Sequence, residues 1–194
     1  YNRRIIEALR QPLEDKSITI ARLRTTVQYP ARFILLATAN PCPCGFYGSS
    51  RCICTPAKIA QYRQRLSGPI LDRIDMHVTV ESIAHQSILN HKSSKSADRV
   101  MQTSIQEARY RQYKRYRITK TNGEASNAEL LAHAALTPKA TTFLNQAAQQ
   151  LDISARSYVR LVKIARTIAD LSKSLSVTTE HIAEALQYRP SQSD

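Results

Sequence analysis

The fold class of this chain is decided by one uninterrupted apolar run, Arg32-Phe33-Ile34-Leu35-Leu36-Ala37-Thr38-Ala39-Asn40. A continuous run of this length predicts a strand buried on both faces, as in a parallel sheet covered by helices. The run ends on the polar residue Asn40. Ligands of such sheets bind beyond the carboxyl ends of the strands, so Asn40 is a candidate site residue. The residues alone favour the alternative, an asparagine that ends a strand and caps a turn.

Two shorter strand-like runs precede this segment and predict a β-hairpin. They cover Ser17–Ala21 and Thr25–Tyr29, and the link between them contains Arg22 and Arg24. The tip of the hairpin is therefore basic. It is either a contact for nucleic-acid phosphates or an ordinary exposed turn, and the residues favour neither interpretation.

Helix caps and apolar periodicity predict the remaining elements. These are a helix over Asn2–Arg10 stopped by Pro12, a helix over Pro56–Arg65, a strand over His77–Val80, and helices over Ala97–Arg117, over Asn127–His133 and from Thr137, Ser154 and Thr178 onward. The layout predicts an α/β plus all-α chain, in which a partial parallel sheet with a β-hairpin insertion precedes a helical domain. We expect the α/β part over residues 1–83, a linker over 84–96, the helical domain over 97–190 and a tail over 191–194.

The composition favours an anionic partner. The chain of 194 residues has a formal net charge of +13 and a sequence pI near 9.9, which suit binding to nucleic acid or nucleotide. It contains neither an apolar run long enough to span a bilayer nor a secretory signal, so we expect no membrane attachment.

All four cysteines fall in one short segment, as Cys42-x-Cys44, seven residues, then Cys52-x-Cys54. A disulfide scaffold would spread its cysteines along the chain, so this pattern favours a reducing compartment such as the cytoplasm. Four thiolates on one loop form the closed tetrahedral set that structural zinc prefers. We therefore predict a structural Zn²⁺ site, with free thiols as the alternative.

Several longer motifs occur together in a fixed order. They are Glu7-Ala8-Leu9-Arg10-Gln11-Pro12-Leu13-Glu14-Asp15, Asn40-Pro41-Cys42-Pro43-Cys44-Gly45, Leu66-Ser67-Gly68-Pro69-Ile70-Leu71-Asp72-Arg73-Ile74-Asp75 and Leu151-Asp152-Ile153-Ser154-Ala155-Arg156. On these motifs the chain resembles the magnesium-chelatase-like AAA+ ATPases, and within them the competence-protein (ComM, YifB) group.

The resemblance implies an ATPase that uses ATP and Mg²⁺ and assembles into a ring, expected to be a hexamer. The phosphate-binding motif Gly-x4-Gly-Lys-Ser/Thr does not occur in the 194 residues, which contain only four glycines. The resemblance places this motif and the Walker B carboxylates upstream of Tyr1. We therefore expect these residues alone to hydrolyse no ATP.

The resemblance also implies roles for three polar residues. Asn40 corresponds to sensor 1, which orients the attacking water near the γ-phosphate. Arg73 corresponds to the arginine finger, which reaches the site of a neighbouring subunit; the alternative is a salt bridge to Asp72 or Asp75. Arg156 corresponds to sensor 2, which contacts the nucleotide of its own subunit, and the alternative is a solvated helix face.

In related helicases the matching hairpin faces a central pore, where Arg22 and Arg24 would grip the nucleic-acid backbone. A second basic segment, Arg109–Lys120, interleaves tyrosines with cations. We interpret its tyrosines as packing on the helical domain, with a mild electrostatic contribution from the charges.

Three functional hypotheses follow. The first is an ATP-driven ring motor on DNA, which promotes branch migration in recombination or natural transformation. The second is the ATPase subunit of a metal insertase of the magnesium-chelatase type. The third is a zinc-stabilised DNA-binding module, which would not need the combination of Asn40, Arg73 and Arg156.

Overall fold

The structure is a computed structural model that describes residues 3–64, 68–80 and 95–190. The chain divides into two compact units, one over Tyr1–Ile74 together with Pro190–Asp194 and the other over Asp75–Arg189. Most of the predicted linker, the predicted tail and the helix-starting Asn2 lie outside the described residues. Each unit is described separately below.

The first unit begins with two short helices, α1 over Arg3–Ala8 and α2 over Arg10–Asp15. The prediction that Pro12 stops the helix is wrong, because Pro12 lies buried inside α2. It occupies the first turn, where a missing backbone N–H removes no helical hydrogen bond. Lys16, with a left-handed φ of 53°, ends α2 and turns the chain into the hairpin.

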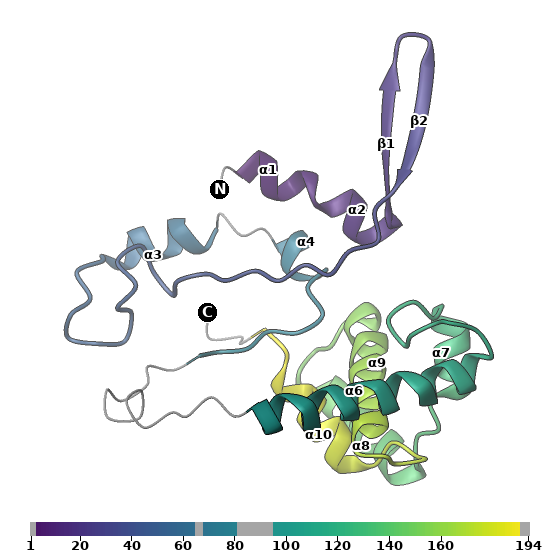
Figure 1. The fold of residues 1–194 in the computed structure, drawn as a ribbon. Helices are drawn as coiled ribbons and strands as arrows, with labels where there is room; N and C mark the ends of the chain where they lie inside the picture. The colour runs from purple at the N-terminus through teal and green to yellow at the C-terminus, as the bar shows by residue number, and fades with distance from the viewer. Residues whose placement is uncertain (1–2, 65–67, 81–94, 191–194) are drawn as a thin grey trace. The chain divides into compact units, whose positions relative to one another are not determined.

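The predicted hairpin is confirmed, with β1 over Ser17–Arg22 and β2 over Thr25–Pro30 in antiparallel register. It extends away from α1 and α2 (Figure 1). Ile18 pairs with Tyr29 and Ile20 pairs with Val27 across the two strands. Because side chains alternate between faces along a strand, these four apolar residues share one face of the hairpin. All four are exposed within the described structure.

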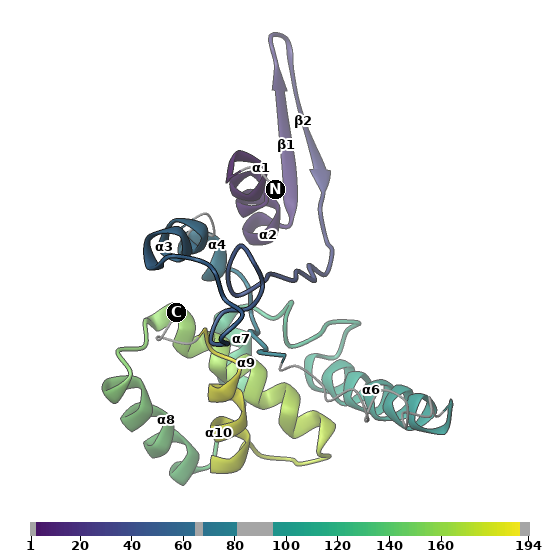
Figure 2. The ribbon, with the colours of Figure 1, turned by 90° about the vertical axis from the view of Figure 1, so that its left-hand side faces the viewer.

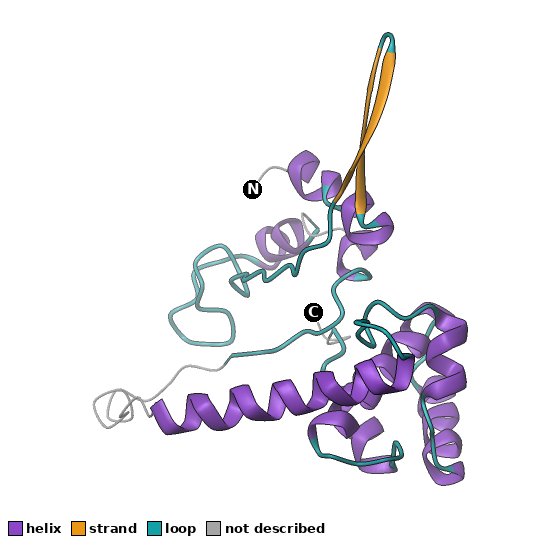
Figure 3. Cartoon of the chain, turned by 45° about the vertical axis from the view of Figure 1, so that its right-hand side comes forward, coloured by secondary structure: helices purple, strands orange, loops and turns teal. Residues whose placement is uncertain are grey.

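The buried strand predicted over residues 32–40 is not present. Residues 31–40 form an extended loop, drawn in teal in Figure 3, and the side chain of Ile34 is 91% exposed. A strand exists only when neighbouring strands satisfy its backbone groups. Within the described residues the sheet contains only β1 and β2, so the apolar run has no strand beside it.

The strand predicted over His77–Val80 is also wrong, since residues 76–80 have no regular structure. His77 instead donates its backbone N–H to the carbonyl oxygen of Tyr188 at 2.8 Å. Two further helices belong to the first unit, α3 over Pro56–Arg63 and α4 over Gly68–Leu71.

The second unit is the predicted helical bundle. Its helices are α6 over Lys95–Tyr116, α7 over Asn127–His133, α8 over Pro138–Gln150, α9 over Ala155–Leu171 and α10 over Thr179–Gln187. Thr137, Ser154 and Thr178 cap α8, α9 and α10 as predicted, whereas Ser126 rather than Asn127 caps α7. The caps are local signals, which explains why these helix starts follow from the sequence.

Helix α9 lies at the centre of this bundle and packs against α6, α7 and α10 (Figures 1 and 2). Its buried residues Leu161, Val162, Ala165 and Ala169 follow the helical period that the sequence predicts. They join the apolar core with Leu144 and others from α7, α8 and α10. Among the described helices, none combines the length and apolar composition that a membrane crossing requires.

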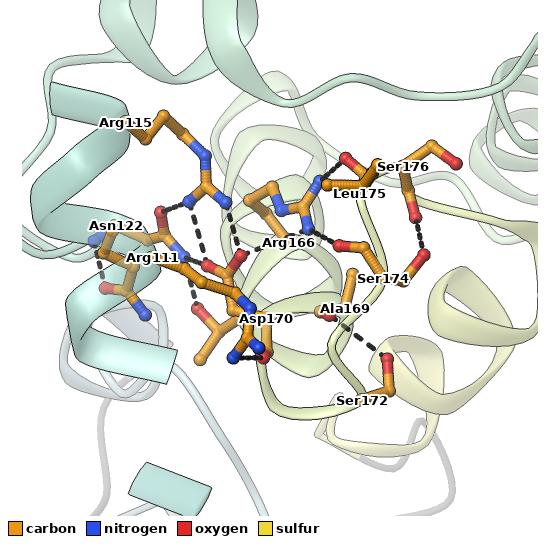
Figure 4. A network of polar contacts seen from close by, with 12 residues as sticks. Arg111, Arg115, Asn122, Arg166, Ala169, Asp170, Ser172, Ser174, Leu175 and Ser176 are labelled. Carbon is orange, nitrogen blue, oxygen red and sulfur yellow. Dashed lines mark hydrogen bonds and ion pairs between the residues drawn. The ribbon is translucent and has the colours of Figure 1, made fainter. Parts of the chain in front are cut away.

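A polar network joins α6 to α9 inside this bundle (Figure 4). Asp170 accepts hydrogen bonds from Arg115 at 2.9 Å, from Arg166 at 3.1 Å and from Asn122 at 3.0 Å. Asp170 and Arg166 are 0% and 1% exposed. Buried charges cost free energy unless they are paired and hydrogen-bonded, and here each one is.

Candidate metal centre and nucleotide-site residues

The four cysteines converge on one point of the first unit. Their Sγ atoms all lie within 4.8 Å of one another. The distance from Cys42 Sγ is 3.4 Å to Cys44 Sγ and 3.9 Å to Cys52 Sγ, and Cys44 and Cys52 are 3.7 Å apart. Tetrahedral zinc with Zn–S bonds of about 2.3 Å separates its sulfur atoms by about 3.8 Å. The donor set and its spacing therefore fit Zn²⁺, and none of the four thiols is in a disulfide.

The protein environment shifts the pKa values of two of the thiols in opposite directions. Backbone hydrogen bonds with Phe46 and Ile53 lower the pKa of Cys44 to about 6. Loss of solvent contact raises the pKa of Cys54 to about 11. A cluster of four thiolates would repel itself without a cation at its centre, and a bound metal supplies that charge.

Turns and cation–ring contacts shape the loop that carries the cysteines. Gly45 and Gly48 have left-handed φ values of 82° and 81°, which a side chain would strain. Arg51 stacks on the Phe46 ring, with its Cζ atom 4.1 Å from the ring centre. Directly after Cys54, Thr55 caps α3. These turns and contacts help to fix the conformation of the loop.

Asn40 lies beside this loop. A Cβ atom placed on Gly45 would be 3.9 Å from Nδ2 of Asn40, so the exposed Asn40 amide lies near Gly45. Asn40 therefore adjoins the predicted zinc site, two residues before Cys42, although it does not end a strand in this structure.

Arg73 forms an ion pair that the sequence did not suggest. Its Nε donates to Oε2 of Glu14 at 3.0 Å, and its Nη2 contacts the same oxygen. The Arg73 side chain is 7% exposed, whereas that of Glu14 is 44% exposed. The two residues are 59 positions apart, so no local motif could identify Glu14, whereas the alternatives predicted for Arg73 were its neighbours Asp72 and Asp75.

Arg156 belongs to the second unit, while Asn40 and Arg73 belong to the first. It occupies the first turn of α9, two residues after the cap Ser154, and it is exposed. The structure thus places Asn40 next to the cysteines and pairs Arg73 with Glu14, and it describes Arg156 in a separate unit.

The basic candidates lie at two exposed places. Arg22 ends β1, and Arg24 lies in the two-residue turn before β2. In the second basic segment, the predicted packing of the tyrosines is only partly correct. Tyr116 packs on the core and donates to Asn122 at 3.0 Å, whereas Tyr110 is 62% exposed.

Two protein-family models match the chain, one over each of its two parts. Residues 1–88 match the family model described as magnesium chelatase, subunit ChlI, and residues 91–189 match the model of the ChlI C-terminal part. The chain belongs to the magnesium chelatase ChlI family. The resemblance stated from the motifs is thereby confirmed.

Individual relatives of the chain come from several bacteria. The chain is 36% identical over 189 residues to competence protein ComM of Haemophilus influenzae. It is 35% identical over 193 residues to a protein designated YifB of Escherichia coli and 34% identical over 189 residues to YifB of Salmonella typhimurium. Each match covers 97% of this chain and 37% of the relative, so the chain spans less than half of their length.

Proposed function

We propose that this member of the ChlI family is part of an ATP-hydrolysing ring motor that acts on DNA. The motor would be a helicase that promotes branch migration in recombination or natural transformation. The observation that carries the proposal is the hairpin: it extends from the first unit and presents exposed Arg22 and Arg24 at its tip. Guanidinium groups in that position suit phosphate neutralisation that does not depend on sequence.

In the proposed motor, three of the described residues would sense the bound nucleotide and complete its site. Asn40 would orient the attacking water, since its amide both donates and accepts hydrogen bonds. Arg73 would stabilise the developing charge on the transferred phosphoryl group in a neighbouring subunit, expected to be one of six. Arg156 would contact the phosphates of its own subunit. ATP and Mg²⁺ would supply the reacting group and its charge neutralisation.

In the proposed function, the role of zinc is structural. Cys42, Cys44, Cys52 and Cys54 would hold Zn²⁺, which would fix the loop beside Asn40. Four cysteine ligands leave no open coordination position, so a catalytic zinc is not part of the proposal.

The deciding experiment measures DNA-stimulated ATP hydrolysis and unwinding of branched DNA by the intact protein. It compares wild type with the double variant Arg22→Ala/Arg24→Ala, and with Lys139→Ala as a matched control at an exposed cation of α8. We expect the double variant to lose DNA stimulation while its basal hydrolysis and that of the control stay near wild type.

The same experiment tests the hypothesis that the protein is the ATPase subunit of a metal insertase. Competence protein ComM of Haemophilus influenzae is named for competence, whereas the family model is named for magnesium chelatase. If DNA neither binds nor stimulates hydrolysis at moderate salt, the motor proposal fails and the metal-insertase hypothesis replaces it.

A further inference from the structure

The outer face of α6 combines an exposed aromatic ring with cations. The buried residues of α6 are Ala108 and Gln112. Tyr110 lies between them in sequence, and two residues correspond to about 200° of rotation around a helix. Tyr110 therefore points away from the core, which agrees with its exposure of 62%.

A cation lies beside this ring. The Nζ atom of Lys114 lies 5.3 Å from the centre of the Tyr110 ring. Both residues, together with Gln106, Glu107 and Arg111, line one open hollow on the surface of α6. The hollow thus offers a flat ring for stacking, an amide, and two cations for a phosphate.

The local charge favours an anionic occupant. Helix α6 contains six lysine and arginine residues against two acids, Asp98 and Glu107. Glu107 is neutralised by Lys173, whose Nζ lies 2.6 Å from its carboxylate. The cation Arg115 is likewise neutralised by Asp170 inside the bundle. Arg109 and Lys114 lie at exposed positions of α6 and add to the positive charge of its outer face.

We propose that this face of α6 is a binding surface for single-stranded DNA, separate from the hairpin. Tyr110 stacks on a base, and Lys114 neutralises an adjacent phosphate. Single strands suit the surface because their bases are free to stack on an aromatic ring, whereas duplex bases are already stacked. The inference rests on the proposed action on DNA, and it adds a contact on the second unit to the one proposed for the first.

The test measures the affinity of the intact protein for fluorescent oligothymidylate at several salt concentrations. We expect Tyr110→Ala to weaken binding at least about fivefold, while Tyr110→Phe binds like wild type because phenylalanine keeps the stacking ring. Lys114→Ala should lower the slope of log affinity against log salt by about 0.7. Lys139→Ala on α8 is the matched charge control, and circular dichroism checks that each variant is folded.

The outcomes separate this inference from the proposed function. If wild type binds DNA but Tyr110→Ala and Lys114→Ala bind as tightly as Lys139→Ala, the α6 surface is not used and only this inference fails. If wild type does not bind DNA at low salt, the action on DNA fails as well. Heparin provides phosphate-like charge without bases; equal losses of heparin and DNA binding in Tyr110→Ala would overturn the stacking role.

Discussion

The guanidinium of Arg115 on α6 and the carboxylate of Asp170 on α9 form a two-pronged ion pair, in which Nη1 lies 2.9 Å from Oδ2. The same carboxylate also accepts from Arg166 at 3.1 Å. One buried acid thus pairs with two guanidinium groups and ties α6 to the central helix.

Removal of this carboxylate should therefore be costly. Asp170→Ala would leave two arginines inside the bundle without their counter-charge, so we expect the free energy of unfolding to fall by about 3–5 kcal/mol. Chemical denaturation of the chain, followed by circular dichroism, measures this loss. Asp98→Ala, which removes an exposed acid of α6, should change stability by less than about 0.5 kcal/mol. Equal stability of the two variants would contradict the role of Asp170.

The cysteine cluster predicts that the chain binds zinc in a fixed ratio. Chain purified without chelator should contain about one zinc per molecule, since four thiolates make one tetrahedral site. Cys52→Ser should lose most of this zinc, whereas Ser50→Ala, an exposed neighbour in the same loop, should keep it. Elemental analysis and the absorption of the cobalt-substituted chain measure occupancy. Metal-free wild type with four reactive thiols would refute the site.

The Arg73–Glu14 pair predicts a graded series of hydrolysis rates in the intact protein. The proposed role of Arg73 as an arginine finger, which acts on the transition state, predicts that Arg73→Ala lowers kcat by about 10³ while ATP binding persists. Arg73→Lys should not restore the rate, since lysine lacks the planar fork. Glu14→Gln should lower kcat less, by misplacing the guanidinium. Lys58→Ala on α3 serves as control, and normal hydrolysis by Arg73→Ala would remove the assignment.

The lowered pKa of Glu129 predicts that the stability of the folded chain depends on pH. Hydrogen bonds from Lys120 and from the backbone and side chain of Ser126 lower its pKa from 4.5 to about 2. Because the folded pKa is depressed, the stabilisation is complete above about pH 4.5 and is lost as the pH falls through about 2. The melting temperature of Glu129→Gln should thus lie below that of wild type at pH 7, and the difference should vanish near pH 2. A difference that is constant with pH would exclude this linkage.

Local signals and nonlocal contacts explain which predictions succeeded. Thr137 and Ser154 mark helix starts because a cap acts on the next three residues, and the cysteine spacing is likewise confined to one loop. The run over residues 32–40 has the composition of a buried strand, but composition supplies no neighbouring strand. Glu14 could not be linked to Arg73, because their contact depends on how distant segments fold together.

The contacts of Arg166 determine which nearby positions can vary in sequence. Its guanidinium donates to the main-chain oxygens of Ala134 at 3.2 Å, Ser174 at 2.7 Å and Leu175 at 3.0 Å. A carbonyl oxygen is the same whatever side chain its residue carries. Mutational drift in the segment that joins α9 to α10 should therefore be tolerated at Ser174 and Leu175, whereas Arg166 itself has no substitute with the same reach and number of donors.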